Sequence, residues 1–86
     1  MIYCVEDEEI MCDLMVYTLN NSGYQAEGFG DGEGLKKALK AETPELIILD
    51  VILPGESGLE ILKQLRRNPE THSTPVILAT SKTSEI

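Results

Sequence analysis

Apolar residues form three short continuous runs along this chain, at Ile2–Val5, Leu46–Leu49 and Val76–Ala79. The run Leu46–Leu49 is too short for a helix and lacks the alternation of a strand with one solvated face. A run of this kind is typical of a strand covered on both faces of a parallel sheet. We therefore expect three strands, with Leu46–Leu49 at the centre.

Polar and apolar residues between the first two runs follow a helical period over Glu8–Asn21. Its apolar residues are Ile10, Leu14 and Tyr17 on one face, with Met11 and Met15 beside them. The helix should stop near Ser22, because Gly23 can take the left-handed conformation that ends helices. The mixed segment Tyr24–Phe29 then predicts a weak strand at a sheet edge.

Two further helices are predicted from their capping residues. Asp31 can cap a short helix whose inward residues are Leu35, Ala38 and Leu39. Ser57 and Glu60 have the spacing of a capping box, and the helix that they start should run to about Arg67 with a buried stripe of Ile61, Leu62 and Leu65. Strands alternating with helices through short connections predict an α/β domain with a parallel sheet and helices on both faces.

Composition narrows the class of protein. The chain has 86 residues, enough for one domain, and its net charge of −8 disfavours binding to nucleic acid or to anionic membranes. The nearest thing to a basic cluster is Lys36, Lys37 and Lys40, which we interpret as the solvated face of a helix. No apolar stretch is long enough to span a bilayer, and no secretion signal precedes the first strand.

The two cysteines do not suggest a disulfide framework. Cys4 lies in an apolar run and Cys12 in a helical pattern, so we expect reduced thiols in a cytoplasmic protein. We interpret the single histidine, His72, as an exposed loop residue.

Each apolar run ends on an oxygen-bearing side chain: Glu6 and Asp7 after the first, Asp50 after the second and Thr80 after the third. In a parallel sheet these residues meet at the edge where open α/β sheets bind their ligands. Carboxylates gathered there repel one another unless a cation lies between them. An oxygen-coordinated divalent ion such as Mg²⁺ is the natural candidate.

These features together resemble the receiver domain of bacterial two-component response regulators. The matching motifs are Val5-Glu6-Asp7, Asp50 at the end of the central strand, Leu53-Pro54-Gly55-Glu56-Ser57-Gly58, and Pro75-Val76-Ile77-Leu78-Ala79-Thr80-Ser81. The resemblance covers residues 1–86 as the N-terminal portion of such a domain. It implies a flavodoxin-like (CheY-like) doubly wound parallel sheet with strand order 2-1-3-4, incomplete because the fifth strand and the last helices are missing.

The resemblance also implies a role for each site residue. Asp50 would be the phosphoacceptor, taking a phosphoryl group from a sensor histidine kinase. Glu6, Asp7, Asp50 and the backbone carbonyl of Ile52 would hold Mg²⁺, although Glu6 stands where the family usually has aspartate. Thr80 would be the switch hydroxyl, and phosphorylation would change contacts with an output domain or a downstream protein. Such a domain is a regulator rather than an enzyme, with at most slow self-phosphorylation and dephosphorylation.

One family feature is absent from the sequence. The chain stops at Ile86, before the family's fifth strand and the lysine that follows it, and Lys82 lies too early to replace that lysine. We therefore expect a truncated piece of a longer regulator, whose uncovered apolar surface makes it self-associate, most simply as a two-fold homodimer.

The sequence also bears on three other functions. A receiver-like interaction module that acts without phosphorylation remains an alternative. A flavin- or nucleotide-binding protein needs a phosphate cradle after the first strand, where Glu6–Glu9 would repel phosphate. A phosphohydrolase with a D-x-D motif would need an aspartate at Ile52.

Overall fold

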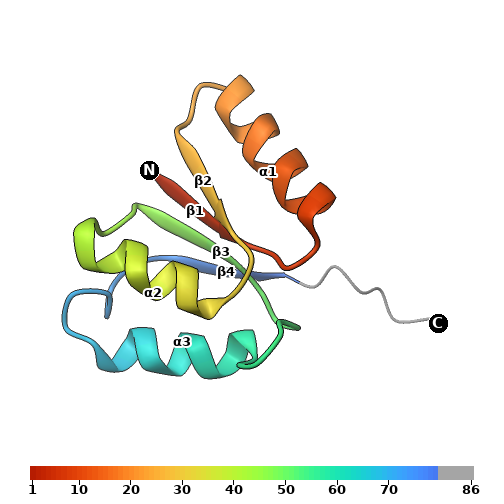
Figure 1. The fold of residues 1–86 in the computed structure, drawn as a ribbon. Helices are drawn as coiled ribbons and strands as arrows, with labels where there is room; N and C mark the ends of the chain where they lie inside the picture. Colours follow the sequence, from red (N-terminus) through yellow and green to blue (C-terminus); the bar gives the residue numbers. More distant parts are fainter. Residues whose placement is uncertain (80–86) are drawn as a thin grey trace.

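The computed structural model describes residues 1–79, in which four parallel strands alternate with three helices (Figure 1). The elements are β1 Ile2–Val5, α1 Glu9–Asn21, β2 Ala26–Phe29, α2 Gly32–Ala41, β3 Leu46–Asp50, α3 Gly58–Arg67 and β4 Val76–Ala79. The sheet order is β2-β1-β3-β4, so the predicted doubly wound sheet with order 2-1-3-4 is confirmed. As expected, β2 lies at an edge and β3 lies inside the sheet.

Local signals in the sequence set the helix ends where they were predicted. The Asp31 carboxylate accepts a hydrogen bond from the Gly34 amide at 2.9 Å and begins α2. The Ser57 hydroxyl accepts one from the Glu60 amide at 3.3 Å and begins α3. Gly23 follows α1 with a φ of 99°, a conformation that glycine adopts without strain.

Helices α2 and α3 cover one face of the sheet together (Figure 1), and the main core lies beneath them. Alternate residues of β1 and β3 point into this core and meet side chains from both helices: Tyr3, Val5, Ile47 and Leu49 from the strands, and Leu35, Ile61 and Leu65 from the helices. Because these side chains are all buried, this face of the sheet is closed over β1 and β3.

Among the helices of residues 1–79, α1 is the one on the opposite face (Figure 1), and its buried residue is Cys12. A Cβ built on Gly28 of β2 would lie 2.5 Å from the Cys12 sulfur, so only glycine allows the helix to approach β2 this closely. Cys4 and Cys12 are both buried and unpaired, which confirms the expected free thiols. His72 is exposed, as predicted.

The apolar residues Ile10, Leu14 and Tyr17, which helical spacing places on one side of α1, are 78%, 55% and 65% exposed, and the residue that the helix buries is Cys12. One expectation about this face was wrong, because strand β3 is not covered on both faces. Ile48 is only half-buried and lines an open groove with Leu14, Met15, Thr18 and Leu19.

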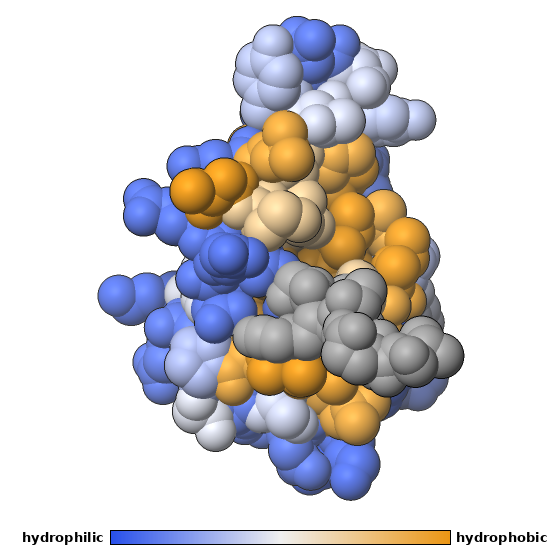
Figure 2. Space-filling view, turned by 90° about the vertical axis from the view of Figure 1, so that its right-hand side faces the viewer, coloured by the Kyte–Doolittle hydropathy of each residue, from blue (hydrophilic) through white to orange (hydrophobic). Residues whose placement is uncertain are grey.

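Hydrophobic residues gather on the side of the molecule shown in Figure 2. Several large apolar side chains on α1 and β4 are exposed in residues 1–79, namely Ile10, Met11, Leu14, Tyr17, Ile77 and Leu78. None of the helices in this part of the chain has both the length and the hydropathy needed to cross a bilayer.

Candidate metal and phosphoryl site

Three carboxylates meet at the carboxyl ends of β1 and β3. These strands are neighbours, with Val5 opposite Leu49, so the residues that follow lie side by side. One carboxylate oxygen from each of Glu6, Asp7 and Asp50 lies within 4.8 Å of the other two. The sequence therefore predicted correctly that these three residues converge, whereas Thr80 lies outside the described residues.

The site is buried on one side and open on the other. Glu6 and Asp50 are 4% and 3% exposed, whereas Asp7 is exposed to solvent. Asp50 is held at the end of an inner strand, and its Oδ1 atom accepts a hydrogen bond from the Ile52 amide at 3.1 Å. The Ile52 side chain is exposed. The exposed Asp7 therefore gives the site one side that is open to solvent.

Burial raises the pKa of Glu6, and the negative charges of Asp50 and Asp7 raise it further. A hydrogen bond from the Glu8 amide to Glu6 Oε2, 3.0 Å long, opposes that shift. In residues 1–79, no lysine or arginine forms an ion pair with Glu6 or Asp7. Glu6 and Asp7 therefore bring negative charge to the site that a bound cation would offset.

The donor set fits a small hard cation. Mg²⁺ prefers oxygen ligands at about 2.0–2.1 Å, so oxygens on opposite sides of one ion lie about 4 Å apart. The three carboxylates each offer one oxygen within a span of 4.8 Å, which is slightly wider than the oxygens around one bound ion. Glu6, Asp7 and Asp50 are thus the residues that could hold Mg²⁺.

The loop after Asp50 is packed tightly against the end of β3. The Gly58 amide donates to the Val51 carbonyl at 2.8 Å, and the Val51 amide donates to Ala79 at 2.8 Å. A Cβ at Gly58 would clash with the carbonyl oxygen of Asp50. The loop therefore leaves Asp50 and returns to it within a few residues.

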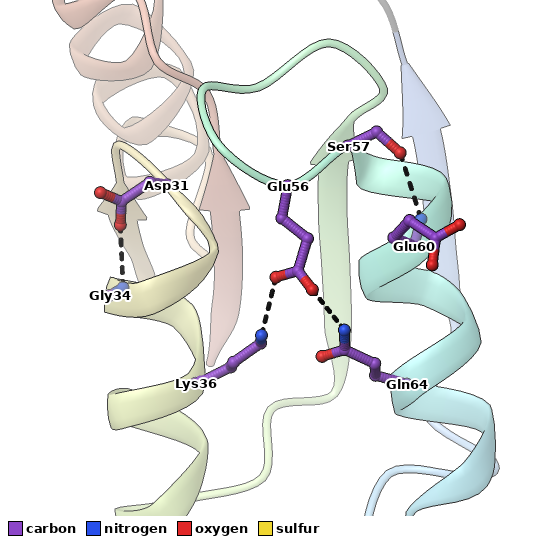
Figure 3. A network of polar contacts seen from close by, with 7 residues as sticks. All are labelled: Asp31, Gly34, Lys36, Glu56, Ser57, Glu60 and Gln64. Atoms are coloured by element: carbon purple, nitrogen blue, oxygen red, sulfur yellow. Dashed lines mark hydrogen bonds and ion pairs between the residues drawn. The ribbon is translucent and has the colours of Figure 1, made fainter.

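Sequence reasoning missed one set of contacts beside this site. Glu56 in the β3–α3 loop accepts hydrogen bonds from Lys36 of α2 and Gln64 of α3 (Figure 3). These two hydrogen bonds lower the pKa of Glu56. Lys36 was expected only to face solvent. No local pattern could have revealed the contact, because the partners belong to different elements.

Comparisons with known proteins agree with this geometry. A family model for the response regulator receiver domain matches residues 2–86. The phosphate regulon transcriptional regulatory protein PhoB of Rhizobium meliloti is 38% identical over 84 residues, covering 98% of this chain and 37% of that protein. The alkaline phosphatase synthesis transcriptional regulatory protein PhoP of Bacillus subtilis is 40% identical over 84 residues, covering 98% and 34%. The chain thus spans about a third of the length of these relatives.

Solved structures share the same fold. The N-terminal domain of a response regulator receiver protein from Methanoculleus marisnigri JR1 has a TM-score of 0.89 and 31% identity, covering 98% of this chain and 68% of that one. The response regulator protein TrrA from Thermotoga maritima, solved in complex with Mg²⁺-BeF, has a TM-score of 0.85 and 30% identity, covering 95% and 70%.

Proposed function

The chain belongs to the response regulator receiver domain family, and from this membership we propose that Asp50 accepts a phosphoryl group from a sensor histidine kinase. Receiver domains are the regulatory parts of two-component systems, and accepting phosphate is general to the family. The observation that carries the proposal for this chain is the meeting of Glu6, Asp7 and the buried Asp50 at one edge of the sheet.

The proposed reaction is a transfer between two side chains. A carboxylate oxygen of Asp50 attacks the phosphorus of a phosphohistidine on the kinase, forming a P–O bond as the P–N bond breaks. The P–N electron pair returns to the imidazole nitrogen, and the ring leaves neutral when its other nitrogen carries a proton. The product is an acyl phosphate on Asp50.

We propose that Glu6, Asp7, Asp50 and the backbone carbonyl of Ile52 hold Mg²⁺ during this transfer. The ion would offset negative charge on the phosphoryl oxygens. The hydrogen bond from the Glu8 amide orients Glu6, which supports a role for this longer side chain in place of aspartate. Without the ion, the carboxylates would repel an incoming phosphoryl group.

The signal would leave the site through Thr80 and the adjoining surface. We propose that the Thr80 hydroxyl binds a phosphoryl oxygen and that this contact changes binding to an output domain or a downstream protein. The transcriptional regulators among the relatives support an output of this kind. The domain would act in the cytoplasm, with only slow self-phosphorylation and dephosphorylation of its own.

The exposed apolar side chains of α1 and β4 support a further part of the proposal. We propose that this surface makes the 86-residue chain self-associate as a two-fold homodimer. The same surface favours the second candidate function, a phosphorylation-independent interaction module.

Phosphorylation of intact protein tests the main proposal. The wild type is incubated with acetyl phosphate and Mg²⁺, and its intact mass is compared with that of Asp50→Asn. We expect one phosphoryl group on the wild type and none on the variant. Asp13→Asn, which changes an exposed carboxylate on α1, is the matched control and should be labelled normally. Equal labelling of Asp50→Asn would contradict the assignment, and an unlabelled wild type would favour the interaction module.

Mg²⁺ binding provides a separate test. Asp7→Asn removes one of the three carboxylates and should weaken Mg²⁺ binding about tenfold or more, measured by calorimetric titration. An unchanged affinity would show that Asp7 does not take part in the site.

A further inference from the structure

Glu56 connects three elements through one carboxylate. It belongs to the loop between β3 and α3, and its side chain points between α2 and α3 (Figure 3). Its Oε1 atom accepts from the Lys36 ammonium at 2.7 Å, and its Oε2 atom accepts from the Gln64 amide. Both oxygens are therefore occupied, each by a different helix.

The two helices approach each other closely beneath this carboxylate. A Cβ built on Gly32, the first residue of α2, would lie 2.8 Å from Cδ1 of Ile61 in α3 and 3.4 Å from Oε1 of Glu56. Gly32 and Gly58, the first residue of α3, are both buried. The start of each helix is thus closely packed, and Glu56 is hydrogen-bonded to both helices.

The base of the same loop is attached to the site. The Ile52 amide donates to the carboxylate of Asp50, and the Gly58 amide donates to the Val51 carbonyl. The tip of the loop turns at Gly55, which has a φ of 80°. Among the side-chain hydrogen bonds formed within residues 1–79, those of Glu56 tie this tip to α2 and α3.

We propose that Glu56 is a positioning residue, which holds the β3–α3 loop in the conformation that the site at Asp50 requires by bridging Lys36 and Gln64. Its link to metal binding rests on the proposed function, because the loop carries the carbonyl of Ile52. Its effect on the loop itself does not depend on that function. Loss of the bridge would detach the tip of the loop from α2 and α3 and weaken the hydrogen bonds at the base of the loop.

Hydrogen exchange of single amides, followed by NMR on the metal-free protein, tests the bridge directly. Glu56→Ala should speed exchange at the Ile52 and Gly58 amides about fivefold. The effect should be smaller than that of losing a buried charged hydrogen bond, because the Glu56 side chain is 33% exposed. Exchange at the amide of Leu65, a core residue of α3, should be accelerated less. Mg²⁺ affinity, measured in parallel, should fall about threefold to tenfold.

Two further variants show whether the bridge is the cause. The reversed pair Lys36→Glu with Glu56→Lys restores opposite charges, and Gln64 can accept as well as donate, so exchange and Mg²⁺ affinity should return toward wild type. Lys63→Ala breaks the exposed pair with Glu60 at 3.5 Å on α3 and should change neither readout.

Several results would overturn the inference. They are unchanged exchange at Ile52 and Gly58 in Glu56→Ala, equal acceleration at Leu65, or a reversed pair that behaves like Glu56→Ala. Wild-type protein that binds no Mg²⁺ would contradict the proposed function instead, and exchange would still decide whether Glu56 holds the loop.

Discussion

The two faces of the sheet are closed to different degrees. Under α2 and α3, the residues Tyr3, Val5, Ile47 and Leu49 are between 0% and 2% exposed. Under α1, Cys12 packs against Gly28 of β2, whereas Ile48 of β3 lines an open groove.

This difference suggests that one face of the sheet stabilises the fold and the other serves binding. The closed face has an apolar core and polar contacts between its helices and loops, so it should supply most of the stability. The α1 face combines exposed apolar side chains with the buried carboxylates Glu6 and Asp50, so it is the face where partners and ions would act. Four predictions test this division, in decreasing order of effect.

Leu49 and Ile48 are neighbours on β3 that point to opposite faces. Leu49→Ala should lower the free energy of unfolding by about 3–4 kcal/mol, because it leaves a cavity in a closed core. Ile48→Ala should cost only about 1 kcal/mol, since its side chain is half-exposed. Urea unfolding of both variants measures the difference, and equal losses would show that the two faces contribute alike.

Arg66 stabilises the closed face through polar contacts. Its Nη1 atom donates to the carbonyls of Thr71, His72 and Thr74 at 3.3, 3.1 and 2.8 Å. Arg66→Ala should therefore cost about 1–2 kcal/mol. The same change at the neighbouring exposed Arg67 is the control and should stay within about 0.5 kcal/mol. If both variants lose the same free energy of unfolding, the contacts of Arg66 with this loop do not stabilise the closed face.

Unlike Arg66, which stabilises the closed face, the ionised Glu6 side chain should destabilise the fold from the α1 face. Its pKa is raised in the folded state by burial first, so the folded protein binds a proton more tightly than the unfolded chain does. Stability should fall as pH rises from the ordinary glutamate range of about 4.3 through the raised pKa. The side chain of Glu6→Gln cannot lose a proton. The variant should therefore have a free energy of unfolding about 1 kcal/mol higher than the wild type at neutral pH, which is the size of a typical single-residue effect, and an unchanged one at low pH.

Glu9→Gln is the control for this measurement, because Glu9 is exposed in the first turn of α1. Urea unfolding across the pH range should show the change in Glu6→Gln alone. A Glu6→Gln curve parallel to that of the wild type would mean that Glu6 does not carry a raised pKa.

Leu14 should matter least for stability and most for self-association. It is 55% exposed on α1, so Leu14→Gln should change the free energy of unfolding by less than about 0.5 kcal/mol. It should weaken the proposed dimer, seen by sedimentation at micromolar concentration. A wild-type monomer would refute the dimer, and an equally strong Leu14→Gln dimer would place the interface elsewhere.

The sequence allowed most of the fold to be predicted because its signals are local. Capping residues such as Asp31 and Ser57 act within one helical turn, and the run Leu46–Leu49 marks an inner strand directly. The convergence of Glu6, Asp7 and Asp50 followed from strand order alone. The functional roles of these residues stay predictions.

Longer-range features could not be obtained in this way. Helical spacing places Ile10 and Leu14 on one side of α1, but it does not say whether anything covers that side. The bridge of Lys36, Glu56 and Gln64 joins residues 20 and 8 positions apart, and each has an ordinary polar side chain. Only packing of the helices brings them together.

The contact between Gly58 and the carbonyl of Asp50 has a genetic consequence. Glycine alone lacks a Cβ, so every missense change at codon 58 adds an atom that clashes with the backbone of the strand carrying Asp50. At Gly30, a Cβ would meet nothing within 4 Å. A library covering every substitution should therefore keep a single amino acid at position 58 and many at position 30, whichever partner or signal is used for selection.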